Sequence, residues 1–113
     1  MASRPATRGY VPDTGDVVWL EFNPQAGHRQ ALVLSPSAYN SKTGLMVCCP
    51  LSTKIKGYPF EVKAMVDDQE GVVLSDQVKS LDWKTRGAKK KGTVAEVVLA
   101  EVRAKIKALL LIK

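Results

Sequence analysis

Residues 14–35 are TGDVVWLEFNPQAGHRQALVLS, two runs of strand-forming residues separated by a Pro- and Gly-containing segment. The first run, residues 17–22, follows the turn signal Thr14-Gly15-Asp16 and predicts a β-strand. The second run, residues 31–35, stops at Pro36 and predicts another strand. Residues 23–27 between them predict a turn. Short strands at such close intervals are typical of a small barrel or sandwich.

The rest of the chain continues this pattern and then changes period. Further strands are predicted at residues 45–49, which stop at Pro50, and at residues 60–63, 71–74 and 78–81, whereas residues 37–44 predict a loop. Thr93-Val94-Ala95-Glu96 matches a capping box. The apolar residues Val98, Val102 and Ile106 follow at spacing four, which predicts an amphipathic helix of about 17 residues. We expect one mainly β domain over residues 10–113 with a C-terminal helix, after a flexible lead-in over residues 1–9.

Composition restricts the class of partner. The chain has 113 residues, 17 Lys and Arg against 11 Asp and Glu, and a net charge of +6, which favours a polyanionic partner such as nucleic acid. Cys48 and Cys49 are neighbours and should point to opposite faces of a strand, so they are poorly placed to pair. Unpaired cysteines fit a cytoplasmic location. We expect no metal or other cofactor, because one His and two Cys make no ligand set, and no membrane contact, because no apolar run is long enough.

Polar and charged residues gather next to the predicted strands. His28 and Arg29 precede the second strand, and they combine a proton carrier that titrates near neutral pH with a cationic fork that fits a phosphate. Other candidates follow the third and fifth strands: Ser52, Thr53, Lys56, Asp76, Gln77 and Lys79. Each also has a local interpretation as a loop hydroxyl, a turn cap or a solvated charge. We interpret Trp19 and Trp83 as core or interface residues. The run Lys89-Lys90-Lys91 is interpreted as a solvated segment.

The order and spacing of these short blocks resemble those of the MazF toxins of bacterial toxin–antitoxin pairs. The blocks are Tyr10-Val11-Pro12-Asp13, Gly15-Asp16-Val17-Val18-Trp19, Gly27-His28-Arg29, Tyr39-Asn40, Lys56-Gly57-Tyr58-Pro59-Phe60, Asp76-Gln77-Val78-Lys79-Ser80 and Lys90-Lys91-Gly92-Thr93. The resemblance implies an SH3-like small barrel of the PemK/MazF/CcdB type and a cytoplasmic homodimer. It further implies a type II toxin–antitoxin endoribonuclease that cuts single-stranded RNA without a metal, leaving 2′,3′-cyclic phosphate and 5′-hydroxyl ends. The implied partner is a MazE-like antitoxin with an acidic tail.

The resemblance also assigns roles to the candidates. The key arginine of the family falls on Arg29, its key threonine on Ser52, and an acidic position implicated as a base on Asp76. Arg29 suits charge stabilisation at the phosphate, because a guanidinium group keeps its proton and cannot act as a base. Ser52 would donate a hydrogen bond to the phosphate, and His28 or Asp76 would carry the proton. The RNA path implied by the family would include Thr53, Lys56, Gln77 and Lys79.

Two alternatives stay open, and a difference from the family supports the first of them. The connection before Gly27 is short and lacks the usual loop glutamate, and Gln30 stands where relatives usually have proline. One alternative is therefore a catalytically impaired homologue that only binds antitoxin. The other is a gyrase-poisoning toxin like CcdB, which the ending Leu111-Ile112-Lys113 disfavours, since CcdB-like proteins depend on an aromatic-Gly-apolar C-terminus.

Overall fold

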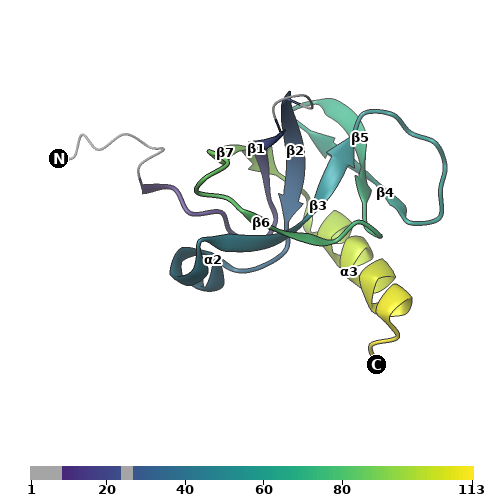
Figure 1. Cartoon of the computed structure of the whole chain (residues 1–113). Coiled ribbons are helices and arrows are strands. Elements are labelled where there is room, and N and C mark those ends of the chain that lie inside the picture. The colour runs from purple at the N-terminus through teal and green to yellow at the C-terminus, as the bar shows by residue number, and fades with distance from the viewer. Residues whose placement is uncertain (1–8, 24–26) are drawn as a thin grey trace.

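The chain folds into one curved antiparallel sheet with a helix at either end (Figure 1). The computed structural model describes residues 9–23 and 27–113, and the side chains of residues 22, 23, 27 and 28 lie outside the description. The elements in chain order are β1 (Asp16–Asn23), β2 (Gly27–Val33), α2 (Ser37–Thr43), β3 (Leu45–Ser52), β4 (Glu61–Val66), β5 (Gln69–Leu74), β6 (Lys79–Asp82), β7 (Lys89–Thr93) and α3 (Glu96–Leu110). The expected mainly β fold with a C-terminal helix is confirmed. The expected lead-in falls almost wholly on residues 1–8, outside the described residues.

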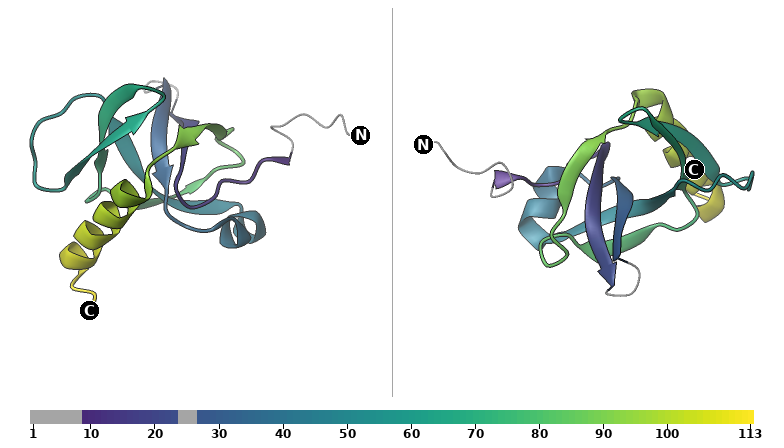
Figure 2. Two further views of the ribbon diagram at one scale, coloured as in Figure 1. Left: turned by 180° about the vertical axis from the view of Figure 1, so that it is seen from behind. Right: turned by 90° about the horizontal axis from the view of Figure 1, so that it is seen from above.

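The strands follow the order β4-β5-β3-β2-β1-β7, and β6 also pairs with β3. Viewed from above, the sheet curls on itself like a small barrel (Figure 2). β3 lies at the centre, because it pairs with β2 along one edge and with β6 and then β5 along the other. This central strand therefore links the two halves of the sheet.

β3 continues through Pro50, although the sequence predicted that the strand stops there. The Leu34 amide donates to the Val47 carbonyl of β3, so Val47 and alternate residues after it bond toward β2. Pro50 therefore faces the other edge, where pairing with β6 ends at Cys48 and pairing with β5 begins at Leu51. The missing N–H of proline falls in this gap, where the strand tolerates it.

The segment between β2 and β3 also differs from expectation, because residues 37–43 form the helix α2 where the sequence predicted a loop. The Asn40 side chain is fully buried and donates to the Pro12 and Ser35 carbonyls at 2.8 and 3.0 Å. Gly44 ends the helix in the left-handed conformation with φ of 75°. Contacts distant in sequence thus stabilise this short polar helix.

The predicted capping box does not form, because Thr93 is the last residue of β7. β7 pairs with β1, and the ammonium of Lys90 lies 3.6 Å from the Asp16 carboxylate. The lysine run is therefore an edge strand and not only a solvated segment. α3 begins at Glu96, and its N-cap residue Ala95 makes no side-chain cap hydrogen bond.

Two apolar clusters form the core, one on each side of the central strands. Cys49 packs in the cluster that includes Leu99 and Val102 of α3, whereas Cys48 packs in the cluster that includes Trp83. Both cysteines are free, as expected, and burial raises the pKa of each thiol to about 12. In the described residues, no helix has the length and apolar character needed to cross a membrane.

Candidate active site

Arg29 lies within a strand and not on the turn that the sequence predicted before it. β2 begins at Gly27, four residues earlier than expected, because its first residues pair with β1 as far as Asn23. On its other edge, β2 pairs with β3 in the register Ala31 opposite Pro50 and Leu32 opposite Cys49. The pairing ends at Ala31 and Pro50, and Arg29 and Ser52 lie two positions beyond that pair on their own strands. Neighbouring strands lie about 4.8 Å apart, so the two residues lie at the same end of the two strands.

A surface hollow of about 390 Å³ lies at this end of β2 and β3. It is lined by Trp19, Arg29, Gln30, Leu51, Ser52, Thr53 and Lys54. Three strands contribute, because β1 supplies Trp19 and the chain leaving β3 supplies Thr53 and Lys54. Two cations and two hydroxyl groups therefore line one hollow.

The Ser52 hydroxyl is held by the turn that follows it. Its oxygen accepts a hydrogen bond from the Lys54 amide at 3.0 Å, while its contact with the Lys54 carbonyl is long, at 3.5 Å. The hydroxyl hydrogen is thus only weakly engaged and can be donated to a bound anion. Gly71 of β5 packs so closely that a Cβ atom there would lie 2.8 Å from the Ser52 carbonyl oxygen. Because Gly71 has no side chain, β5 can pack this closely against the backbone of Ser52.

Arg29 is exposed. Among the described residues it has no carboxylate partner within ion-pair distance, whereas Lys90 pairs with Asp16. A guanidinium group presents two parallel donors that match two oxygens of a phosphate. Together with the Ser52 hydroxyl and the charge of Lys54, it makes the hollow suitable for binding an oxyanion.

The structure brings together Arg29, Ser52 and Thr53 but places Asp76, Gln77 and Lys79 elsewhere. These three follow β5 or begin β6, along the edge of β3 that faces away from β2. Asp76 is near Cys49, since its charge helps to raise the pKa of that thiol, after burial as the main cause. Among the described residues that line the Arg29 hollow, none of the three is found. The described residues also hold no group of three His, Cys, Asp or Glu side chains that could bind a metal ion.

The two remaining predicted residues are Lys56 and His28. Lys56 lies in the segment before β4, where its amide and that of Gly57 donate to the Glu61 carboxylate, at 3.2 and 2.8 Å. Its ammonium lies 5.8 Å from the centre of the Tyr58 ring, outside the lining of the hollow. The His28 side chain lies outside the described residues, although its backbone pairs with Glu21.

Trp19 and Gln30 line the hollow but were not among the predicted site residues. Trp19 was interpreted as core or interface, yet its side chain is 38% exposed. Their role as neighbours follows from pairing between β1 and β2, in which Trp19 lies directly opposite Gln30. No local feature of the run at residues 17–22 distinguishes this tryptophan from a core residue, so only the strand pairing could reveal it.

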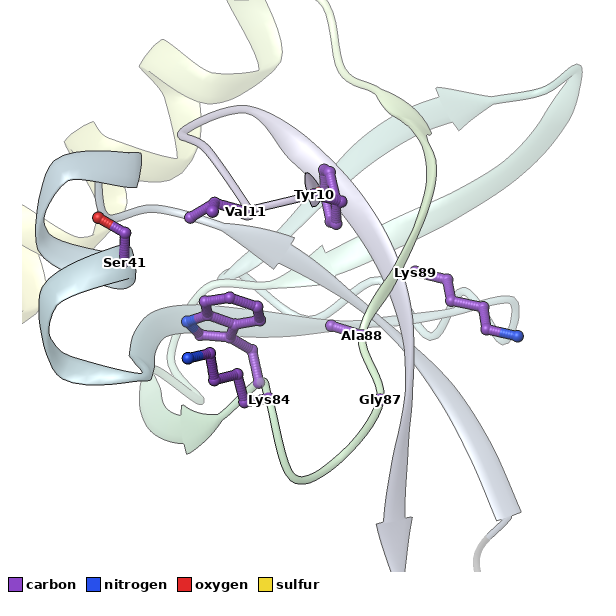
Figure 3. Close-up of a pocket in the computed structure, with 8 residues that line it drawn as sticks. Tyr10, Val11, Ser41, Lys84, Gly87, Ala88 and Lys89 are labelled. Carbon is purple, nitrogen blue, oxygen red and sulfur yellow. The ribbon is translucent and has the colours of Figure 1, made fainter. Parts of the chain in front are cut away.

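A second cavity, of about 400 Å³, lies near α2 and the segment leading to β7 (Figure 3). Its aromatic residues already have polar partners in the fold. The Tyr10 hydroxyl donates to Asp16 at 2.7 Å, and the Trp83 indole donates to the Asn40 carbonyl at 3.0 Å. Burial, followed by the bond to Asp16, raises the pKa of Tyr10. These contacts join the N-terminal segment to the sheet, and the Arg29 hollow is the better candidate for chemistry.

Comparison with known proteins agrees with the geometry. Residues 13–110 match the family described as PemK-like, MazF-like toxin of type II toxin–antitoxin system. The endoribonuclease toxin MazF of Escherichia coli strain K12 is 54% identical over 106 residues, 89% of this chain and 96% of that protein, and the endoribonuclease toxin ChpB of the same strain is 32% identical over 107 residues, 85% and 91%. In a MazE–MazF crystal structure from Deinococcus radiodurans, a chain 51% identical superposes with a TM-score of 0.84, covering 92% of this chain and 100% of the other. The SH3-like barrel type and the resemblance noted in the sequence are thereby confirmed, and the chain belongs to the PemK-like, MazF-like family of toxins from type II toxin–antitoxin systems.

Proposed function

We propose that this chain is the endoribonuclease toxin of a type II toxin–antitoxin system and that it cuts single-stranded RNA, such as mRNA, in the hollow between Arg29 and Ser52. The observation that carries the proposal is that Arg29 of β2 and Ser52 of β3 line the same hollow, together with Thr53 and Lys54. Membership of the family supports it, because relatives at 54% and 32% identity are named endoribonuclease toxins.

The proposed chemistry needs no metal, because the nucleophile belongs to the RNA. The 2′-oxygen attacks the adjacent phosphorus, the bond to the 5′-oxygen breaks, and the products carry a 2′,3′-cyclic phosphate and a 5′-hydroxyl. Arg29 would bind two oxygens of the phosphorane, and Ser52 would donate a hydrogen bond to it. A base must take the 2′ proton and an acid must supply one to the leaving oxygen. His28, next to Arg29 in the chain, is the first candidate, and Asp76, which does not line the hollow, is the second. Arg29 itself is unsuitable as a base, since a guanidinium group is not deprotonated in proteins.

The proposal is tested by incubating the protein with a mixed-sequence single-stranded RNA in EDTA. Mass analysis of the fragments should show cyclic phosphate and 5′-hydroxyl ends at the same rate as in magnesium. The matched control is the Arg29→Ala variant purified in the same way, which should leave the RNA intact. Cleavage that stops in EDTA and returns with magnesium would contradict the mechanism.

The same experiment decides between this function and an impaired homologue. In the sequence, three residues, Pro24, Gln25 and Ala26, separate the end of β1 from the start of β2, and none is a glutamate. A protein that binds antitoxin tightly but leaves every RNA intact would favour the impaired homologue. Cleavage comparable with other toxins of the family would favour the enzyme.

The partners proposed are a MazE-like antitoxin with an acidic tail and a second copy of this chain. The net charge of +6 supports the first, and related MazF chains crystallise with MazE. The exposed Leu109 and Leu110 at the end of α3 support an apolar contact between copies. Lys56, Gln77 and Lys79 would then extend the RNA path beyond the hollow. Antitoxin binding should weaken as salt rises, and light scattering should give twice the 12.3 kDa chain mass; a monomer at micromolar concentration would refute the dimer.

A further inference from the structure

The Trp19 side chain is partly exposed, although the residues around it in β1 are buried. Its neighbours in β1, Val18 and Leu20, are fully buried, and so is Val17 on its own face of the strand. Trp19 is nonetheless 38% exposed and lines the hollow that holds Arg29 and Ser52. An indole whose apolar surface is left open beside an anion-binding hollow can still be covered by a ligand.

The surroundings of Trp19 suit a nucleobase. The Lys91 ammonium lies 5.0 Å from the centre of the ring, so a cation and an aromatic surface stand together. Proteins that bind single-stranded nucleic acid combine basic side chains for the phosphates with aromatic rings for the bases. Lys91 belongs to β7 and Trp19 to β1, and pairing of these two strands holds the arrangement in place.

Gln30 adds a group that can distinguish bases. It lies directly opposite Trp19 in the pairing of β1 with β2, and it lines the same hollow. Its amide offers two donors and an acceptor, so it can both give and take hydrogen bonds at the edge of a base. A glutamine amide can form two hydrogen bonds with the edge of one base.

We propose that Trp19 and Gln30 form a nucleobase subsite next to the phosphate held by Arg29, and that this subsite sets the base preference of the enzyme. The inference rests on the proposed function. One base of the RNA stacks on the Trp19 ring while the Gln30 amide binds its edge. Arg29 and Gln30 are neighbours on β2, so their side chains leave the strand in different directions. Gln30 lies opposite Trp19 of β1, and both residues line the hollow together with Arg29 and Ser52. Gln30 would thus bind the base while its neighbour Arg29 binds the phosphate.

Stacking is tested by intrinsic fluorescence, because the chain has two tryptophans and Trp83 is only 6% exposed. The probe is a labelled mixed-sequence single-stranded oligodeoxyribonucleotide, which lacks the 2′-hydroxyl and is not cut. Its binding, followed by anisotropy, should quench the emission of the native protein, and Trp19→Phe should bind with little quenching. Trp19→Leu should bind about tenfold more weakly than Trp19→Phe, since phenylalanine keeps a stacking face and leucine does not.

Base recognition is tested with Gln30→Leu, which keeps the size of the side chain and removes the amide. The native enzyme should prefer one base at one position next to the cleaved bond, measured as kcat/KM on RNAs that differ only there. Gln30→Leu should reduce that preference by about tenfold. A merely structural role of Gln30 would lower all substrates alike and leave the preference unchanged.

Each outcome separates this inference from the proposed function. Binding without quenching in the native protein, equal affinity of the Phe and Leu variants, or an unchanged preference in Gln30→Leu would overturn the subsite while the ribonuclease assignment stands. A native protein that neither binds the oligonucleotide nor cuts RNA would overturn the proposed function, and the subsite with it.

Discussion

Replacing Gly71 with alanine should disturb both stability and cleavage, because β5 and β3 touch there without room for a side chain. The added Cβ would lie 2.8 Å from the Ser52 carbonyl oxygen and 3.6 Å from its carbonyl carbon. Contacts below 3.0 Å are essentially never seen for real Cβ atoms, and a backbone carbonyl cannot rotate away as a side chain can. β3 must therefore shift at the residue that carries the site hydroxyl.

The expected size follows from two opposing effects. Overpacking of this kind destabilises by about 1–3 kcal/mol. Alanine also restricts the unfolded chain, which stabilises by about 0.4–1 kcal/mol. The net loss should be about 1–2 kcal/mol, which lowers Tm by about 4–8 °C in a domain of this size. Displacement of Ser52 by a few tenths of an ångström should lower kcat/KM by about tenfold.

Gly92→Ala is the matched control, because Gly92 is also a strand glycine. The three heavy atoms nearest to its Cβ all belong to side chains, with a methyl group of Val66 at 3.1 Å, so the contact is longer than at Gly71 and involves no backbone carbonyl. The control should change stability by less than about 0.5 kcal/mol and leave cleavage unaffected. Thermal unfolding by circular dichroism and cleavage of a fluorogenic RNA measure the two effects. The reasoning is wrong if Gly71→Ala melts at or above the native Tm, or if the two variants lose equal stability.

Three further predictions concern the site and the buried thiols. Arg29→Ala should lower kcat/KM by about 10²–10³, as loss of an oxyanion donor does, and Arg29→Lys should recover only part of it; near-native cleavage by the Ala variant would refute the assignment. Ser52→Thr should cut RNA at close to the native rate, whereas Ser52→Ala should be at least about tenfold slower, and equal rates would remove the hydroxyl from the mechanism. Burial raises the pKa of Cys48 and Cys49 to about 12 from a usual value of 9.0, so above about pH 9 the unfolded chain loses these protons first and stability should fall as pH rises toward 12; a urea midpoint unchanged between pH 8 and pH 10.5 would contradict this.

The strands that could be predicted from the sequence are those whose local pattern suffices. Residues 17–22 became β1, residues 60–63 and 71–74 became parts of β4 and β5, and residues 78–81 largely became β6. In β4 the buried residues Val62, Ala64 and Val66 alternate with more exposed ones, as a strand with one face in the core requires. Runs of this kind carry their own signal, because strand propensity and burial agree.

The elements that could not be predicted depend on distant partners. α2 is short and polar, and the buried amide of Asn40 stabilises it through the Pro12 carbonyl, 28 positions away. β7 consists of lysines, glycine and threonine, and it forms a strand because the free edge of β1 offers a ladder of hydrogen bonds. Lysines are common on edge strands, since their charge prevents a further chain from pairing there. Neither feature is visible within the segment itself.

The site is harder to predict than the strands because it is defined by register. Arg29 and Ser52 belong to strands joined through α2, and they line one hollow because β2 pairs with β3 in the register that sets Ala31 opposite Pro50. A slip of one residue would turn every side chain of β2 to the other face of the sheet. A second pairing, between β1 and β2, sets Gln30 opposite Trp19, and the lack of a side chain at Gly71 lets β5 approach Ser52. Residues at 19, 29, 52 and 71 thus form one site through three strand pairings, so a change in any pairing should alter cleavage even where no lining residue is replaced.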